Sequence, residues 1–391
     1  MLPSLTEARR WTEAGLEVTL VDPQRYLYYS GMVPEHLGGV YDATDIRIDL
    51  ARWAHRAGVS FVPSAATHIA PDDRVVTTAR GDTVPFDVLA MDIGGANPEG
   101  PAAAIGTKPI HRTRALAKRV ETVLASPTKR LRLVVVGGGA AGVEVALNVS
   151  GRFQGAGRQD DLDLALVEQS PRLLPTFPRG LSAHVTDRLQ QRGAAIYPNT
   201  SVTAVNEQEG SGATVDTNRT RPLPADAVLW ATGTVGPPLF RDSRLPTDSQ
   251  GFLQVARTLR APSHPRIFAA GDCATLAGLD LARVGVHAVK QGATLRTNLD
   301  RTLQALAGDN ALPPKHDLQA FRPYPVTPLI LSTGTADGLW TAGPLWAAHP
   351  WLLRLKHWID RRWIRTYAPE RWGTIPWHAL LGAESAADAA R

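Results

Sequence analysis

The chain has 391 residues, enough for two or three domains with full cores, and 43% hydrophobic with 20% charged residues is an ordinary globular composition. A formal charge of +5 is mild at this length and indicates no nucleic-acid partner. The single cysteine, Cys273, excludes an internal disulfide, a Cys-x-x-Cys redox pair and a multi-cysteine zinc site, and the scattered histidines predict no metal. Without a secretory signal or an uncharged apolar run of roughly 18 residues, we expect a cytoplasmic protein, soluble or lying on a membrane.

An internal repeat organises the first part of the chain. Three pairs of segments share an apolar strand pattern at similar offsets: Gly15 to Asp22 with Asp161 to Glu168, Val59 to Ser64 with Ala195 to Thr200, and Pro85 to Gly94 with Pro224 to Gly233. Two copies of one βαβ unit with a β-meander explain this pattern. The sequence therefore predicts two nucleotide-binding units.

The first copy begins inside the helix that should follow its phosphate loop, and its first glycine is Gly15. Either the natural chain starts upstream, or this unit has lost its loop. We favour an upstream start because Asp22 keeps a ribose-binding acid that would have no purpose without the loop.

The second copy opens with a strand of Leu and Val that runs into a GxGxxG loop (Gly137, Gly139, Gly142) and a helix of small and apolar residues. The first glycine allows a tight turn, the second allows backbone N–H groups to approach a pyrophosphate, and the third allows the helix to pack on its strand. The helix N-terminus adds the positive end of its dipole. This stretch predicts a dinucleotide site.

Glu168 ends the next predicted strand, Leu162 to Val167, where a carboxylate can accept hydrogen bonds from a ribose 2′-hydroxyl. The same carboxylate would repel the 2′-phosphate of NADPH. We therefore expect NADH to be preferred. NADPH is not excluded, since Arg172 could turn inward.

Two further strand ends complete a family resemblance. Ala231-Thr232-Gly233 and the stretch from Ile267 to Ala274, which contains Gly271 and Asp272, resemble the ATG and GD motifs of the pyridine nucleotide-disulfide oxidoreductase superfamily. Within it the chain is most similar to type II NADH:quinone dehydrogenases. The resemblance implies FAD in the first unit, NAD(P)H in the inserted second unit, and rings that meet at the domain interface. It implies that Asp272 binds the ribityl and pyrophosphate region of the flavin.

A narrower resemblance covers nearly the whole chain. Arg25 to Gly39, Val284 to Gly292 and Trp351 to Tyr367 look like the flavoprotein branch that often occurs fused to selenide, water dikinase. No kinase domain is present in this sequence. Together these patterns give the expected cofactor-binding residues: Asp22, Tyr29, Gly94, Gly137, Gly139, Gly142, Glu168, Gly233, Gly271 and Asp272.

Three residues are candidates for catalysis through the resemblance. Glu144 matches a carboxylate near the nicotinamide and flavin edge, or is a solvated helix residue. Lys290 and Gln291 lie on the helix that faces flavin and quinone in the relatives, or are ordinary polar helix residues. Cys273 is expected to pack at a turn and not to react. Because a dithiol relay is excluded, the acceptor is a quinone, a small redox protein or dioxygen.

The tail beyond Ala311 contains a predicted amphipathic helix. One face carries Trp351, Leu352, Leu355, Trp358, Ile359 and Trp363, and the other carries Arg354, His357, Arg361 and Arg365. Such a helix can lie in a lipid interface with its indoles at headgroup depth. It can also dock on the protein's own core or on a second subunit of a homodimer.

We expect an α/β fold with two Rossmann-like domains for FAD and NAD(P)H, each with a β-meander, and a C-terminal α+β tail. The predicted domains are 1–107 (FAD, first part), 108–235 (NAD(P)H), 236–310 (FAD, second part) and 311–391 (interface or membrane association). The predicted function is FAD-dependent oxidation of NADH with a quinone-like acceptor at the inner membrane face. The alternatives are a flavoprotein reductase of selenium or sulfur metabolism, and a redox-inactive NADH-binding regulatory protein.

Overall fold

The computed structural model describes residues 2–98, 100–208, 212–309 and 311–368. The chain forms two compact units, each assembled from separate segments. Unit 1 comprises Met1–Leu27, Ile48–Ala96 and Thr234–Pro325, and unit 2 comprises Tyr28–Arg47, Asn97–Gly233 and Val326–Arg391. This division differs from the predicted one at 28–47 and 97–107, which group with unit 2, and in the tail, which is divided at Pro325 between unit 1 and unit 2. The nucleotide assigned to each domain stays a prediction, and residues 369–391 of the predicted C-terminal region 311–391 lie outside the described residues.

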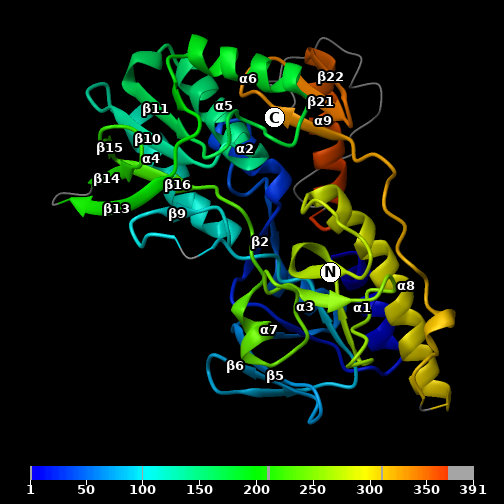
Figure 1. Ribbon diagram of the computed structural model, residues 1–391. Helices are drawn as coiled ribbons and strands as arrows, with labels where there is room; N and C mark the ends of the chain where they lie inside the picture. The colour runs from blue at the N-terminus through cyan, green and yellow to red at the C-terminus, as the bar shows by residue number, and fades with distance from the viewer. Residues whose placement is uncertain (1, 99, 209–211, 310, 369–391) are drawn as a thin grey trace. The chain divides into compact units, whose positions relative to one another are not determined.

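Unit 2 is built on a five-stranded parallel sheet in the order β12-β11-β10-β16-β9 (Figure 1). Its strands are β9 (Ile105–Gly106), β10 (Leu131–Val136), β11 (Leu162–Val167), β12 (Ala195–Tyr197) and β16 (Ala227–Trp230), and its helices are α4 (Arg114–Leu124), α5 (Ala140–Gly155) and α6 (Arg179–Gln191). Leu and Val dominate the central strands because both faces of a parallel sheet are buried, and on one face Val134 and Val136 pack with Val215 and Ala225 of the following antiparallel strands. The predicted strand, glycine loop and helix are confirmed as β10, Gly137–Gly139 and α5.

Each unit also contains an antiparallel meander. In unit 2 it consists of β13 (Val202–Gln208), β14 (Gly212–Thr217) and β15 (Leu223–Ala225), and in unit 1 of β5 (Ala66–Ala70), β6 (Val75–Thr78) and β7 (Thr83–Pro85). A second correspondence lies in the parallel pairs. β1 (Thr19–Val21) pairs with β4 (Ser60–Val62) in unit 1 as β11 pairs with β12 in unit 2. The predicted repeat is confirmed at the level of strand pairing.

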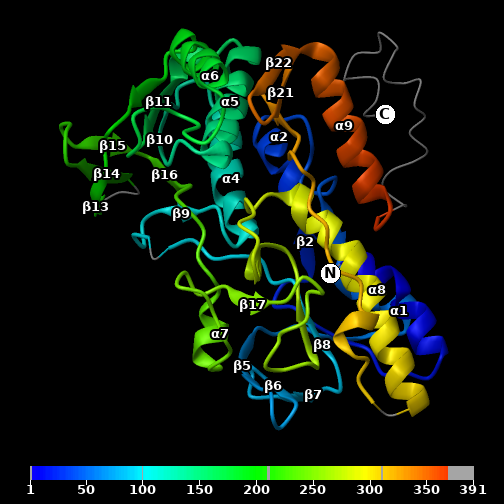
Figure 2. The same cartoon turned by 45° about the vertical axis from the view of Figure 1, so that its right-hand side comes forward.

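The remaining strands of unit 1 come from distant parts of the chain. β8 (Leu89–Met91) pairs with β18 (Ile267–Ala269), and β17 (Leu253–Val255) pairs with β19 (Ala274–Leu276). The helices are α1 (Leu2–Glu13), α3 (Leu50–Ala57), α7 (Pro238–Asp242) and α8 (Gly285–Asp309). Helices α1 and α8 lie side by side (Figure 2), and Trp11 Nε1 donates to Asp300 across them at 2.6 Å. A core around the fully buried Phe240, Phe268 and Phe321 joins the late segments to the early ones.

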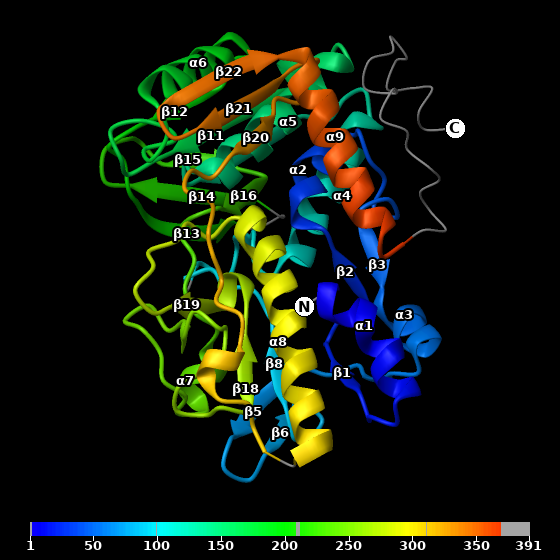
Figure 3. The ribbon, with the colours of Figure 1, turned by 90° about the vertical axis from the view of Figure 1, so that its right-hand side faces the viewer.

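The tail folds onto unit 2. Strands β20 (Leu329–Ser332), β21 (Gly338–Ala342) and β22 (Leu345–His349) form an antiparallel sheet, which α9 (Pro350–Arg365) contacts (Figure 3). The short helix α2 (Val33–Leu37) belongs to the same unit, and the pair β2 (Tyr26–Tyr28) and β3 (Arg47–Asp49) lies where the chain passes between units. No helix of the described residues combines the length and the apolar character needed to span a bilayer.

The buried side of α9 is neither of its two predicted faces. Its most buried residues are Lys356, Asp360 and Ile364, whereas Trp351 is 37% exposed and Ile359 is 45% exposed. The stripe was missed because a lysine and an aspartate four residues apart are typical of an exposed ion pair. Here the two charges neutralise each other inside the unit.

Candidate functional site

The glycine loop after β10 has one function for each glycine. Gly137 has φ +109°, and a Cβ there would lie 2.5 Å from the carbonyl oxygen of Ala231. A Cβ on Gly142 would overlap the carbonyl oxygen of Gly137, so this glycine is needed where α5 meets the loop. Gly139 has no atom within 4 Å of its Cβ direction. Two glycines are thus required by packing, and the third leaves the backbone open to a ligand.

Gly139 is the N-cap of α5, and no side chain caps the helix. The free N–H groups of the first turn and the positive end of the helix dipole remain for an anion. The loop therefore has the open backbone and the donors that a pyrophosphate needs.

Glu168 follows β11 and is held against the loop. Its two carboxylate oxygens accept hydrogen bonds from the backbone N–H groups of Gly138 and Ser170, each at 2.6 Å, and the residue is 7% exposed. A carboxylate has about four acceptor positions, so two remain for ribose hydroxyls. Sequence reasoning placed Glu168 correctly at the strand end but did not predict its bonds to the loop.

Arg172 does not turn toward this carboxylate. Its guanidinium donates to the carbonyl oxygens of Leu174 at 2.8 Å, Pro175 at 2.6 Å and Phe177 at 2.9 Å. A side chain held by three carbonyls is costly to redirect toward a 2′-phosphate. The structure therefore leaves Glu168 as the charge at the end of β11.

In unit 1 the GD turn follows β18. Gly271 has φ +70°, and its N–H donates to Oε1 of Gln291 on α8 at 2.6 Å. The carbonyl oxygen of Asp272 lies 3.6 Å from the Cβ direction of Gly95. Gly94, just after β8, has φ +70° and open space around it. The ends of β8 and β18 thus meet at one turn, as expected at the carboxyl ends of parallel strands.

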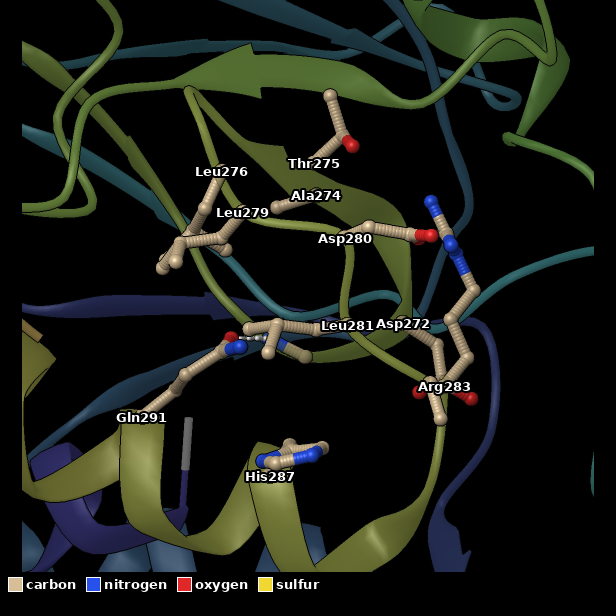
Figure 4. A pocket seen from close by; sticks show the side chains of 12 residues that line it. Asp272, Ala274, Thr275, Leu276, Leu279, Asp280, Leu281, Arg283, His287 and Gln291 are labelled. Carbon is tan, nitrogen blue, oxygen red and sulfur yellow. Dashed lines mark hydrogen bonds between the residues drawn. The ribbon is translucent and has the colours of Figure 1, made fainter. Parts of the chain in front are cut away.

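A small pocket of about 30 Å³ opens beside the GD turn. Figure 4 shows Asp272, Arg283, His287 and Gln291 around it. A cavity of this size holds about one water molecule, so it suits a polar group of a ligand and not a ring system. Of the predicted site residues, Gly271, Asp272 and Gln291 are brought together here.

Other predicted residues of unit 1 lie elsewhere. The Lys290 ammonium lies 3.7 Å from the ring centroid of Tyr324, in a different groove from Gln291. Asp22 follows β1, accepts from the N–H of Gln24 at 2.7 Å, and does not line the pocket. Burial raises the pKa of Asp22 above its ordinary value. The roles of both residues stay predictions.

Cys273 is completely buried, and its thiol donates to the carbonyl oxygen of Ala270 at 3.2 Å. Burial raises the pKa of the thiol to about 12, so it stays protonated at neutral pH. The structure agrees with the expected packing role. Gly233, the end of the ATG motif, has no atom near its Cβ direction.

Unit 2 contains a buried charge cluster, which we define as Glu35, Lys356, His357, Asp360 and Tyr29. The Lys356 ammonium lies 2.7 Å from Glu35 and 2.8 Å from Asp360, and it donates to the carbonyl oxygen of Gly31 at 2.8 Å. His357 Nε2 lies 3.2 Å from the other oxygen of Glu35. Sequence reasoning named neither Glu35, Lys356 nor Asp360 as functional. The only signal was the i, i+4 spacing of Lys356 and Asp360.

The charges in this cluster depend on one another. Burial opposes the ionisation of Glu35, but Lys356 and His357 outweigh it and hold the pKa of Glu35 below its ordinary value. Burial and the charge of Glu35 raise the pKa of Asp360. Burial also opposes the charge of Lys356, yet the two carboxylates keep its pKa well above the ordinary value. Lys356 is thus a permanent cation between two acids.

Tyr29, a predicted cofactor contact, belongs to this cluster. Its hydroxyl donates to Asp360 Oδ1 at 3.1 Å, and its ring stacks on Trp363 with centroids 4.1 Å apart. Burial and the neighbouring Asp360 raise the pKa of the Tyr29 hydroxyl. Both ends of the side chain are engaged within unit 2, and a contact with a cofactor stays a prediction.

Glu144 lies on α5, two residues after the third loop glycine, and faces the tail sheet. Its Oε1 accepts from the N–H of Ser332 at 2.8 Å and from the Ser332 hydroxyl at 3.2 Å. Burial raises the pKa of Glu144 to about 7, and nearby Glu35 and Asp360 add to the rise while Lys356 opposes it. The alternative interpretation of Glu144 as a freely solvated helix residue is wrong, because its carboxyl group is hydrogen-bonded to Ser332 and desolvated.

Comparison with known proteins identifies relatives over most of the chain. A demethylphylloquinone reductase of Synechocystis is 25% identical over 292 residues, which is 72% of this chain and 70% of the relative. A type II NADH:quinone oxidoreductase of Staphylococcus aureus is 26% identical over 308 residues, covering 73% and 76% of the two chains. These relatives confirm the predicted resemblance to type II NADH:quinone dehydrogenases.

Solved structures show the same fold. NDH2 from Plasmodium falciparum in complex with NADH gives a TM-score of 0.72 at 14% identity and covers 92% of this chain and 94% of that one. The sulfide:quinone oxidoreductase of Aquifex aeolicus gives 0.73 at 16% identity, with 94% and 89% covered. The family described as pyridine nucleotide-disulphide oxidoreductase matches residues 4–292. Because this match extends over well more than half of the sequence, the chain belongs to the pyridine nucleotide-disulphide oxidoreductase family.

Proposed function

We propose that the chain oxidises NADH through FAD and passes the electrons to a quinone. The observation that carries this proposal is the glycine loop after β10, with its open Gly139 and its fixed Glu168. Family membership and relatives that are named quinone reductases support the same activity. Both FAD and NADH are cofactors of this activity.

NADH binding is assigned to the residues of the loop. Gly139 and the first turn of α5 would take the pyrophosphate, and Glu168 would accept from the adenosine ribose hydroxyls. The arrangement supports NADH over NADPH, because a carboxylate at 7% exposure would repel a 2′-phosphate and Arg172 is held by three carbonyls.

FAD is assigned to unit 1, where Asp272, Gly271 and Gly94 lie at the strand ends. The small pocket at the GD turn would take a hydroxyl or phosphate oxygen, and Gln291 would fix the turn through the N–H of Gly271. When bound, FAD supplies a ring that accepts a hydride and releases its electrons to an acceptor. Gln291 therefore acts through the turn, which its Oε1 holds by accepting from the Gly271 N–H.

Reduction of a quinone to a quinol consumes protons as well as electrons. Glu144 has a pKa of about 7, so it can hold and release a proton at neutral pH. We assign it this role in the reaction. The electrons leave without a thiol, since the one cysteine of the chain is buried and keeps its proton.

A quinone dissolved in lipid requires contact with a membrane. The outward side of α9 combines the exposed Trp351 and Ile359 with the exposed Arg354 and Arg362, and the Arg362 guanidinium lies 5.4 Å from the Trp358 ring centroid. Aromatic and basic side chains together suit a headgroup layer. This supports a peripheral location on the inner membrane face, with a homodimer contact as the competing use of the same surface.

Spectroscopy under nitrogen tests the proposed function. Purified protein loaded with FAD should lose its flavin absorbance when NADH is added and regain it when menadione is added. Gly139→Val, loaded with FAD in the same way, should bleach only at much higher NADH. Flavin that bleaches but returns only with polysulfide would instead favour the sulfur reductase, and flavin that never bleaches would favour a regulatory NADH-binding protein.

A further inference from the structure

Unit 1 carries a second cavity that the proposed reaction does not use. It is an open groove of about 450 Å³ lined by six residues: Lys290, Thr294 and Arg301 from α8, and Gln319, Ala320 and Arg322 from the segment that follows. Figure 3 shows this segment running alongside α8. The three helix residues recur at spacings that place them on one side of α8.

The groove is strongly positive. Three of its six lining residues are cations and none is acidic. Arg301 donates to the backbone carbonyl of Asp317 at 2.5 Å, which orients the guanidinium without neutralising it. Arg322 is exposed to solvent. None of these three cations forms an ion pair with a residue that the structure describes, and three such cations around one cavity favour an anion.

The walls of the groove are fixed. Asn298 on α8 accepts from the N–H of Gln319 at 2.7 Å and donates to its carbonyl at 2.9 Å. Phe321 is fully buried, and its N–H donates to the carbonyl of Arg257 at 2.7 Å. Residues on either side of Phe321 are thereby held outward. The cations are presented by a built surface and not by a loose loop.

An exposed aromatic side chain adjoins one of the cations. Tyr324 is 44% exposed, and the Lys290 ammonium lies 3.7 Å from its ring centroid. A small free anion would gain nothing from contact with an exposed aromatic side chain beside its site. A phospholipid would gain from this contact, because its phosphate lies at the depth in the membrane interface where tyrosine rings are enriched.

We propose that this groove binds the phosphate of an anionic phospholipid and so holds unit 1 against the bilayer. The proposal rests on the proposed function, which requires access to a quinone in lipid. It is independent of α9, which lies in the other unit.

Vesicle cosedimentation of the FAD-loaded full chain tests the proposal. The vesicles contain phosphatidylcholine with or without phosphatidylglycerol. The double variant Arg301→Gln with Arg322→Gln should bind the anionic vesicles at least about ten-fold more weakly, since each cation near such a surface contributes substantially. Ala320→Glu, at an exposed position, should weaken binding without removing any arginine. Arg80→Gln is the control, because Arg80 is exposed at the β6–β7 turn and its replacement changes the net charge by one, as Ala320→Glu does and as each arginine of the double variant does.

The readouts separate this site from the proposed reaction. NADH oxidation with soluble menadione should be unchanged in the groove variants. If the parent chain fails to reduce menadione, the proposed function is overturned, but the proposed lipid site in the groove is not. Binding of the double variant and of Ala320→Glu at the level of Arg80→Gln would overturn the lipid site. So would inorganic phosphate at low concentration displacing the protein completely from the vesicles, which would identify a free-anion site.

Discussion

Gly139 leaves an empty space where every other residue type would place a side chain, although its backbone conformation does not require glycine. Gly155, at the end of the same helix, is equally open. The two positions differ in what should approach them. In the proposed site, a pyrophosphate would approach the backbone at Gly139, and nothing is expected to bind at Gly155.

We therefore expect Gly139→Val to weaken NADH binding by about ten-fold or more, because the added side chain blocks the approach of the pyrophosphate. Gly155→Val should leave the affinity unchanged. Titration calorimetry with NADH measures both. Equal losses in the two variants would show that helix α5 was disturbed and that Gly139 has no separate role.

Single residues also mark the limits of what the sequence predicts. The glycines and Glu168 could be predicted because a loop motif fixes the backbone positions they need. The partners of Gln291 and Lys290 could not, since adjacent residues on a helix point about 100° apart. The structure directs Gln291 to the GD turn and Lys290 to Tyr324.

For helix α9, the sequence pattern predicts the wrong buried face. Its tryptophans and arginines dominate the helical wheel, but the stripe that docks carries Lys356 and Asp360. A lysine is buried only where counter-charges exist, and Glu35 comes from more than 300 residues earlier in the chain. No local pattern could supply that partner.

Lys356→Met should destabilise unit 2 by about 3 to 5 kcal/mol, because Glu35 and Asp360 would remain buried without a counter-charge. Lys118→Met, at an exposed position of α4, should have little effect. Urea unfolding followed by tryptophan fluorescence measures the difference. Adding Glu35→Gln and Asp360→Asn to Lys356→Met should restore part of the loss, and if it restores none, the charge argument is wrong.

Glu144 links α5 to the tail sheet through a titrating carboxyl. Its pKa rises from 4.5 to about 7 in the folded protein, so folding favours the protonated form. This stabilisation is complete below the unfolded pKa and is lost as the pH rises toward 7. Glu144→Gln mimics the protonated form, so its stability relative to the parent should increase by about 1 to 3 kcal/mol between pH 5 and pH 8.

Chemical unfolding at the two pH values tests this expectation. Glu121→Gln provides the control, since Glu121 is exposed on α4 in the same unit. If the difference in unfolding free energy between the parent and Glu144→Gln is the same at pH 5 and pH 8, Glu144 does not titrate in this range.

At the scale of the whole molecule, the two cofactors are assigned to different units. Hydrogen exchange should register them separately. NADH alone should slow exchange around Gly137–Val143 in unit 2, and FAD alone should slow it around Gly271–Leu276 in unit 1. Protection of the unit 1 turn alone by NADH would reverse the assignment, and the buried strand β10 serves as an internal standard.

The overall architecture was predictable because the repeat and the strand-end motifs recur at regular offsets. The membership of 28–47 in unit 2 was not, because nothing in a short segment such as Glu35 to Gly39 reports a distant partner on α9.

Most of unit 2 lies in the sequence between segments of unit 1. Strand β8 therefore cannot pair until β18, whose Ile267 lies opposite Leu89, has been synthesised. During synthesis on the ribosome, the middle of unit 2 emerges whole and can fold at once, whereas the earlier half-sheet of unit 1 has no partner until much later. Apolar strand edges such as Leu89–Met91 stay uncovered during that interval. Under the proposed assignment, the middle of the NADH-binding unit would therefore fold before the β8–β18 pair of the FAD-binding unit can form, and FAD would bind late in assembly.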